Sequence, residues 1–130
     1  EQGLADYCLA HGIDAPTSIR LPLELDEAVS LLRTLPLGTA IACYNDDVAI
    51  ALLGAARELG RRVPEDVALM GMDATRIGTL VAPRLTTIKV EAAPAMDRMI
   101  RDVVSRVSGS ARPARPTDPV VLTVVPGDSA

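Results

Sequence analysis

The sequence predicts an α/β fold built on a parallel, doubly wound sheet. Short apolar runs that suit buried strands alternate along the chain with segments of helical periodicity. That alternation is typical of a parallel sheet with helices on both faces. The chain has 130 residues, 48% of them hydrophobic and 23% charged, which is the size and composition of one globular domain.

The first expected elements are a helix, a weak strand and a second helix. Residues 1–12 have apolar side chains at helical spacing and end at the His11–Gly12 pair, which suits a helix stop. This helix is already under way at residue 1 and no methionine starts the chain, so we expect a fragment whose upstream part has been removed. Residues 18–23 are expected to form a weak strand limited by proline, and residues 24–35 an amphipathic helix.

The middle of the chain has the clearest alternation. Residues 39–45 have the pattern of a short buried strand, and residues 46–59 that of a helix that ends at Gly60. Residues 66–72 form a continuous apolar run, which predicts a second buried strand. Residues 74–90 are expected to form a loop or short helix that leads into another short strand.

The last third is expected to form an amphipathic helix and a returning strand. The helix occupies residues 91–109, with Pro94 in its first turn. A proline-rich linker follows at 110–118, and the strand covers 119–125. The apolar stripe of the helix consists of Met96, Met99, Ile100, Val103 and Val107.

Composition argues against several functional classes. A formal net charge of −4 does not provide the basic surface by which proteins bind nucleic acid, so this chain by itself is not expected to bind it. No stretch is apolar enough to span a bilayer and no export signal begins the chain, so we expect no membrane association and a cytoplasmic location. Cys8 and Cys43 match neither a disulfide framework nor a metal-ligand spacing, and are expected to be small buried side chains.

No motif in the sequence supports catalysis. The single histidine, His11, lies at a helix end, neither cysteine has a sequence neighbour that would activate it, and no serine lies in a Gly-x-Ser-x-Gly turn. A glycine-rich phosphate loop is also missing from the sequence. We therefore expect no enzyme activity, no catalytic residue, no metal and no cofactor.

Polar residues follow the predicted strands at the point where each strand ends. Asn45, Asp46 and Asp47 follow the first buried strand, Asp73 follows the second, and Thr86, Thr87 and Lys89 surround the next. Because the carboxyl ends of parallel strands form the ligand crevice of a doubly wound sheet, we expect these residues to converge there. A simpler explanation is open for each: helix capping for Asn45 and Asp46, turn capping for Asp73, and strand propensity for the threonines.

The helix predicted at 46–59 is apolar nearly all round, because Ile50 and Leu53 lie outside its main core stripe. A helix of that kind is covered on more than one side. We predict that it forms part of a dimer surface at Ile50, Leu53 and Arg57. The alternative is packing against a neighbouring helix of the same domain.

Several motifs in register identify a family resemblance. The segment TAIACYNDDVAIALLGAARELGRRVPEDVALMGMD, followed by PRLTTIKV, resembles the effector-binding domain of the lactose-repressor (LacI/GalR) transcription regulators over roughly residues 39–90. The matching positions are Asn45-Asp46, Gly60, Val63-Pro64-Glu65-Asp66, Gly71-Met72-Asp73 and Pro83-Arg84-Leu85-Thr86-Thr87.

The resemblance implies a periplasmic-binding-protein-like (type I) fold of two lobes that close on a small effector. It places residues 1–90 in the C-terminal lobe, makes 91–109 a helix that packs on the N-terminal lobe, and puts that lobe and a DNA-binding helix-turn-helix upstream of residue 1. In the complete protein it implies a homodimer that contacts operator DNA through that missing domain.

The effector implied by the resemblance is a sugar, or a nucleoside or purine. Asn45 and Asp73 match positions that hydrogen-bond the effector, and Asp46 belongs to the same motif. Val90 stands where sugar-responsive members often carry a polar residue. The effector-binding set is thus Asn45, Asp46, Asp73 and Val90.

Two other classes are compatible with the pattern. A transport or chemotaxis binding protein of the same fold binds sugar without controlling DNA. A phospho-receiver domain is indicated by acids at 46, 47 and 73 with Lys89, but such a site needs its acid pair two strands before the phosphorylated aspartate. Here a single helix separates them, so the regulator is favoured.

Overall fold

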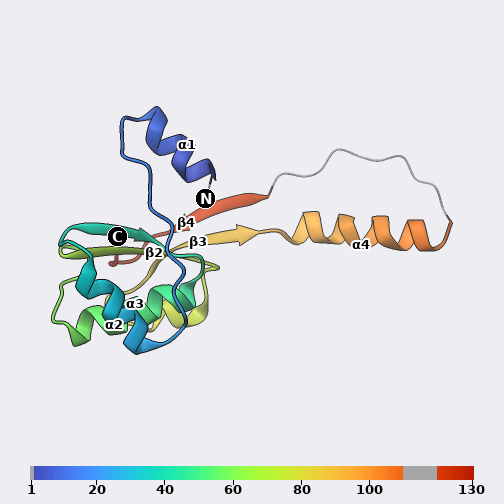
Figure 1. Cartoon of the computed structure of the whole chain (residues 1–130). Helices are drawn as coiled ribbons and strands as arrows, with labels where there is room; N and C mark the ends of the chain where they lie inside the picture. The colour runs from blue at the N-terminus through green and yellow to red at the C-terminus, as the bar shows by residue number, and fades with distance from the viewer. Residues whose placement is uncertain (1, 110–119) are drawn as a thin grey trace.

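The computed structural model describes residues 2–109 and 120–130, and its elements follow the predicted alternation of helices and strands (Figure 1). The predicted linker at 110–118 and residue 119 of the returning strand lie outside the described residues. The elements are α1 (Gln2–Ala10), α2 (Leu25–Thr34), β1 (Thr39–Ala42), α3 (Asp46–Glu58), β2 (Val67–Met72), the 3₁₀ helix η1 (Arg76–Thr79), β3 (Thr86–Glu91), α4 (Ala93–Val107) and β4 (Val121–Val125).

The described strands form one sheet in the order β1-β2-β3-β4. The first three are parallel, with Ile41 beside Leu69 and Gly71 beside Thr87, which confirms the predicted parallel sheet. β4 pairs with β3 in the antiparallel direction, with Ile88 beside Val124. An apolar run gives no strand direction, so this reversal could not be predicted from the pattern.

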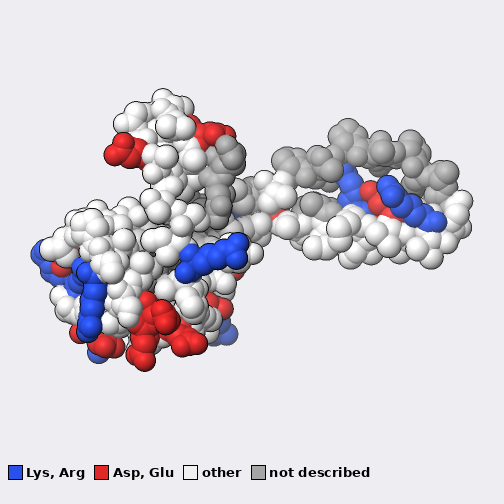
Figure 2. Space-filling view, viewed as in Figure 1, with Lys and Arg blue, Asp and Glu red and all other residues white. Residues whose placement is uncertain are grey.

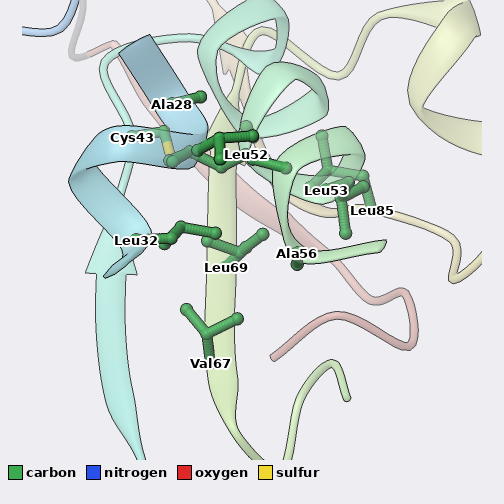
Figure 3. Close-up of a cluster of buried hydrophobic side chains, with 12 residues drawn as sticks. Ala28, Leu32, Cys43, Leu52, Leu53, Ala56, Val67, Leu69 and Leu85 are labelled. Carbon is green, nitrogen blue, oxygen red and sulfur yellow. The ribbon is translucent and has the colours of Figure 1, made fainter. Parts of the chain in front are cut away.

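Helices α2 and α3 pack on one face of the sheet and enclose the core (Figures 1 and 3). The largest fully buried apolar side chains are Leu32, Leu52, Leu69 and Val67. Each buried side chain of this size contributes about 1.5–3 kcal/mol to folding. Small residues let the two helices and the sheet approach closely, and Ala28, Ala49, Ala55 and Ala56 are all completely buried.

The predicted covering of both faces by helices is only partly met in the described residues. Ala40 and Ala42, which point away from α2 and α3, are exposed, and Met70 is half-buried. Figure 1 shows α2 and α3 on one side of the sheet and α1 on the other. The second face is therefore apolar and largely open.

Residues 18–23 do not form the weak strand predicted for them. They lie in an irregular, mostly exposed segment between α1 and α2, with Leu21 partly buried against the core. Pro22 has no N–H to give to a ladder, and its carbonyl accepts from the Glu24 N–H in a turn instead. The prediction was wrong because three alternating apolar residues, Ile19, Leu21 and Leu23, do not outweigh that loss.

The end of α3 shows how the sequence fixes the boundaries of a helix. Gly60 has φ +66, a left-handed conformation that suits glycine. With it, the Gly60 N–H donates to the Arg57 carbonyl at 3.2 Å and the Arg61 N–H to the Ala56 carbonyl at 2.8 Å. The carbonyls that the last turn leaves free are thus bonded, and the chain turns into β2.

Helix α4 extends away from the core, and its apolar stripe is exposed (Figure 1). Between 50% and 85% of the surface of each stripe residue is accessible. These residues are Met96, Met99, Ile100, Val103 and Val107. The helix predicted at 91–109 is therefore present, with an apolar face that no described residue covers.

A buried serine near the C-terminus forms hydrogen bonds to both β2 and β3. Ser129 is completely buried, and its hydroxyl donates to the Leu69 carbonyl at 2.7 Å and accepts from the Thr86 N–H at 2.9 Å. The backbone adds a bond from the Leu69 N–H to the Ser129 carbonyl at 2.7 Å. This contact joins the last residues of the chain to the centre of the sheet.

Replacing Ser129 by alanine is expected to lower the free energy of unfolding by about 1–3 kcal/mol, because a buried N–H and a buried carbonyl both lose their partner. Urea unfolding followed by circular dichroism measures this change. Asp128→Ala is the matched control, since it removes only the exposed ion pair with Arg84. A loss for Asp128→Ala as large as for Ser129→Ala would contradict the role given to the serine.

Candidate functional site

The carboxyl ends of β1, β2 and β3 meet at one edge of the sheet, because the three strands are parallel. Asn45 follows β1 and Asp73 follows β2. Val90 lies in the part of β3 that continues beyond the last paired residue of β2, Met72. The predicted convergence of Asn45 and Asp73 on this edge follows from the topology, which also brings Val90 there.

Asn45 caps helix α3. Its side-chain oxygen accepts a hydrogen bond from the Val48 N–H at 3.0 Å, so the capping explanation is confirmed. The residue is half-buried, and within the described residues its amide nitrogen has no partner. Capping occupies the oxygen only, and the two N–H donors stay available at the sheet edge.

Asp46 lies inside the protein instead of at the open edge. The residue is completely buried. One carboxylate oxygen accepts from the N–H and the hydroxyl of Thr75, at 2.6 and 2.9 Å, and the other accepts from the Thr87 hydroxyl at 2.5 Å. This position corrects the prediction that Asp46 contacts the effector, because the carboxylate is enclosed and both of its oxygens already have donors.

The loop of residues 73–75 has an unusual backbone that is bonded at every residue. Asp73 has φ 107 and Ala74 has φ 52, conformations that cost of order 1–3 kcal/mol each for residues other than glycine. Their N–H groups donate to the Ile88 carbonyl at 2.9 Å and to the Thr87 hydroxyl at 3.3 Å. With the bond from Thr75 to Asp46, three successive N–H groups hold the loop in place.

The carboxylate of Asp73 is exposed at the end of β2. Within residues 2–109 and 120–130 it has no hydrogen-bond or ion-pair partner, and the following helix η1 has no side-chain cap. The turn-capping explanation of this residue is therefore not met in the described structure. Two carboxylate oxygens remain free to accept hydrogen bonds.

The other polar residues of this region have separate roles. Thr86 lies at the amino end of β3 and bonds the C-terminal residues, so it is remote from the carboxyl edge. Lys89 forms an exposed ion pair with Glu91 at 2.6 Å. Val90 is 37% exposed and has no polar group to offer. This arrangement lacks the open acid pair of a phospho-receiver, because Asp46 is enclosed.

The three residues predicted for a dimer surface are not all exposed to solvent. Leu53 is only 7% exposed and belongs to the core, beside Leu85 (Figure 3). Ile50 is half-buried against the same core, and Arg57 is exposed. Helix α2 supplies the second covering of α3, which is the intramolecular alternative, so Leu53 is corrected to a core residue.

Nucleophilic chemistry is not supported near this edge. Burial raises the pKa of the Cys43 thiol to about 12, and the neighbouring Asp46 carboxylate adds to the increase, so the reactive thiolate is suppressed. The His11 side chain donates from Nδ1 to the Tyr7 carbonyl at 2.8 Å, at the end of α1. The described part of the chain contains no cluster of three or more His, Cys, Asp or Glu side chains that could hold a metal ion.

A family model for the periplasmic binding protein-like domain matches residues 1–130. The chain belongs to the periplasmic binding protein-like family. Its relatives are of the LacI/GalR type, which confirms the resemblance found in the motifs. The type I fold of that family is also confirmed.

Solved LacI-family structures have the same fold as this LacI-type domain. The transcriptional regulator CelR in complex with cellobiose has a TM-score of 0.78 at 27% identity, over 99% of this chain and 41% of that chain. A LacI family regulator from Arthrobacter sp. FB24 in complex with lactose has a TM-score of 0.73 at 26% identity, over 98% of this chain and 49% of that chain. The LacI-type domain thus spans about half the length of the structures that it matches.

Among curated proteins, the HTH-type transcriptional regulator YvdE of Bacillus subtilis (strain 168) is 37% identical over 76 residues. The match covers 56% of this chain and 24% of that regulator. The relatives are named as transcription regulators and not as enzymes or transport proteins, which favours the regulator class over the transport alternative.

Two residues around Asp46 were not predicted as site residues from the sequence, although Gly71 belongs to one of the matching motifs. Thr75 supplies two donors to Asp46, and Gly71 makes room for that carboxylate: a Cβ at residue 71 would lie 2.2 Å from an Asp46 oxygen. The available signal was a glycine inside the apolar strand that ends at Asp73, since such a glycine often marks a close approach.

Proposed function

We propose that this domain is the ligand-sensing part of a LacI-type transcription regulator and that it binds a small effector at the carboxyl edge of its sheet. One observation carries the proposal. The Asp73 carboxylate is exposed at the end of β2 and has no partner among the residues that the structure describes, and it lies on a loop whose three successive N–H groups are all bonded. A free acceptor on a fixed loop is suited to ligand recognition.

The chemistry of this edge suits a polyol better than an anion. Asp73 offers two acceptor oxygens to neighbouring hydroxyls, and the Asn45 amide offers two donors. The cellobiose complex of CelR and the lactose complex of the Arthrobacter regulator support a sugar. A nucleoside or purine is the second effector class, because its ring nitrogens and amino groups can also pair with an amide and a carboxylate.

We propose that a second lobe completes the effector cleft and packs on α4. The exposed stripe of Met96, Met99, Ile100 and Val103 is an apolar surface that a second lobe would remove from water. Residues 1–90 would then be the C-terminal lobe, with β4 as the strand that returns to it. Closure of the two lobes on an effector would shift the protein between two orientations.

Operator binding is proposed for another domain of the complete protein. The view in Figure 2 shows acidic and basic side chains interspersed over the core, without a continuous basic surface. The net charge of −4 agrees with this. In the complete regulator the effector would change DNA affinity through coupling between separate domains, and the protein would work in the cytoplasm.

We propose a homodimer through a surface that keeps Ile50 and Arg57 of the predicted set and leaves out the buried Leu53. Leu25 lies over α3 at Gly54, where a Cβ would be 3.3 Å from its side chain, and it is 47% exposed. Ile77 on η1 and Leu80 directly after it are 57% and 77% exposed. Together with half-buried Ile50 and exposed Arg57, these side chains form an apolar surface around α3 that a second copy would cover.

A thermal-shift screen of the full-length protein tests the proposed function. Cellobiose, lactose, guanine, hypoxanthine and adenosine are the probes, with glycerol at equal concentration as the control for non-specific stabilisation. A ligand at about 100 times its Kd stabilises the native state by about 2.7 kcal/mol, which raises the midpoint by several degrees. A shift with a sugar or purine is expected, and identical midpoints with every probe would contradict the proposal.

A further inference from the structure

We infer that Asp46 is the positioning residue of the proposed effector site and acts through the backbone of residues 73–75. It would set the direction of the Asp73 carboxylate without touching the effector. The effect on effector binding rests on the proposed function. The hydrogen bonds between Asp46 and the loop, which we call the Asp46 tie, belong to the fold and can be tested without any ligand.

The Asp46 tie consists of hydrogen bonds between the first turn of α3 and two segments that lie far from it in the sequence. Asp46 accepts from Thr75, 29 residues further along, and from Thr87, 41 residues further along. Helix α3, the loop after β2 and strand β3 therefore meet at one carboxylate. A buried carboxylate needs such donors, because an unpartnered one would be strongly destabilising.

Two glycines lie close to the Asp46 carboxylate and leave space for it. Gly71 lies where any Cβ would collide with the carboxylate, at 2.2 Å from one of its oxygens. Gly78 flanks the other oxygen, at 3.7 Å from a would-be Cβ. Asp46 is completely buried among the described residues and both of its oxygens already accept hydrogen bonds, so its influence on a ligand would be indirect.

The bonds of Asp46 act on the loop that carries Asp73. Thr75 is held directly, and Ala74 is held through Thr87, whose hydroxyl accepts from the Ala74 N–H and donates to Asp46. Asp73 and Ala74 both have positive φ values, which residues of their type rarely adopt. Two of the three bonds that keep them there therefore depend on Asp46, directly or through one hydroxyl.

Thr87→Val is the variant that tests this tie, because it keeps the shape of the side chain and removes the bridging hydroxyl. Thr87→Ser retains the hydroxyl and is the rescue variant. Thr123→Val is the matched control, since Thr123 is an exposed threonine on the neighbouring strand β4. Each is made in the full-length protein.

Amide hydrogen exchange is the first readout and needs no effector. In Thr87→Val the amides of residues 73–75 are expected to exchange at least about tenfold faster, while amides in α2 and α3 keep their protection. Thr87→Ser and Thr123→Val are expected to exchange like the wild type. Unchanged protection of 73–75 in Thr87→Val would overturn the positioning role, whether or not a sugar binds.

Affinity for cellobiose and lactose, measured by calorimetry, is the second readout. Thr87→Val is expected to weaken binding about tenfold, the scale of one hydrogen bond in a preorganised site. In an Asp73→Asn background the same change is expected to have almost no further effect, because the two residues act on one contact. Equal losses in both backgrounds, or a loosened loop with unchanged affinity, would overturn the inference.

The two hypotheses fail in different ways. If neither sugar nor any purine of the screen binds the wild type, the proposed function fails, and the exchange data still decide whether Asp46 and Thr87 hold the loop. If ligands bind and exchange at 73–75 is insensitive to Thr87, the effector site stands and the positioning role fails.

Discussion

Replacing Leu53 by glutamate is expected to unfold the domain. The side chain is 7% exposed and packs in the core beside Leu85 (Figure 3). The change loses about 1.5–3 kcal/mol of apolar burial and adds several kcal/mol for an enclosed carboxylate without a partner. This sum is comparable with the whole stability of a typical domain, about 5–15 kcal/mol. Circular dichroism and size-exclusion chromatography measure the outcome.

Two variants separate this explanation from a role in dimer formation. Arg57→Glu changes the exposed side chain one turn further along α3 and is expected to leave the circular dichroism spectrum unchanged. Leu53→Met keeps the volume and the apolar character and is expected to cost less than about 1.5 kcal/mol. A Leu53→Glu protein that is folded but monomeric would return Leu53 to the dimer surface predicted from the sequence.

Replacing Asp73 by asparagine is expected to weaken effector binding about 10- to 100-fold without loss of stability. A hydrogen bond to a charged group is worth about 1.5–3 kcal/mol, and the carboxylate has no partner in the described structure whose loss would affect folding. Asparagine keeps the shape of the side chain and tolerates positive φ, so the change removes the charge and one of the two acceptor oxygens without altering the fold of the loop. Calorimetry with the probe that gives the largest thermal shift measures the affinity.

Asp47→Asn is the matched control for this experiment. Asp47 is also an exposed acid just beyond a strand end, but it lies in the first turn of α3. Its replacement is expected to leave the affinity within about twofold of the wild type, since surface substitutions away from a site have small effects. Equal affinity of the wild type and Asp73→Asn would remove Asp73 from the site.

The structure could be predicted from the sequence where it depends on the spacing of apolar residues or on the order of the strands. Apolar periodicity predicted helices α2, α3 and α4 and strands β1 and β2 close to their observed bounds, and it predicted the presence of β3 without its bounds. The placing of Asn45 and Asp73 at one sheet edge followed from the parallel topology alone. Neither conclusion needs any knowledge of distant contacts.

The fate of Asp46 could not be predicted, although it is adjacent to Asn45. The first turn of α3 directs the two side chains differently, so that one stays at the edge and the other enters the protein. Its burial is possible only because Thr75 and Thr87 supply donors and Gly71 leaves space. The residues that allow this burial come from three separate segments of the chain, so they produce no periodic pattern in the sequence.

Leu53 shows a second limit. An apolar residue outside the main stripe of a helix predicts a second covering, and this part of the prediction was correct for α3. Whether the covering comes from the same chain or from another depends on the tertiary position of α2 and Leu85. Intramolecular packing and subunit contact use the same side chains, so sequence alone does not separate them.

Strand β3 gives the fold a mechanical property. Its residues Thr87 and Ile88 supply the acceptors that hold Ala74 and Asp73, and its last residue, Glu91, is two positions before the start of α4. β4 runs back along the same strand and stiffens it. One continuous strand therefore connects the start of α4 with the two acceptors that hold the loop carrying Asp73.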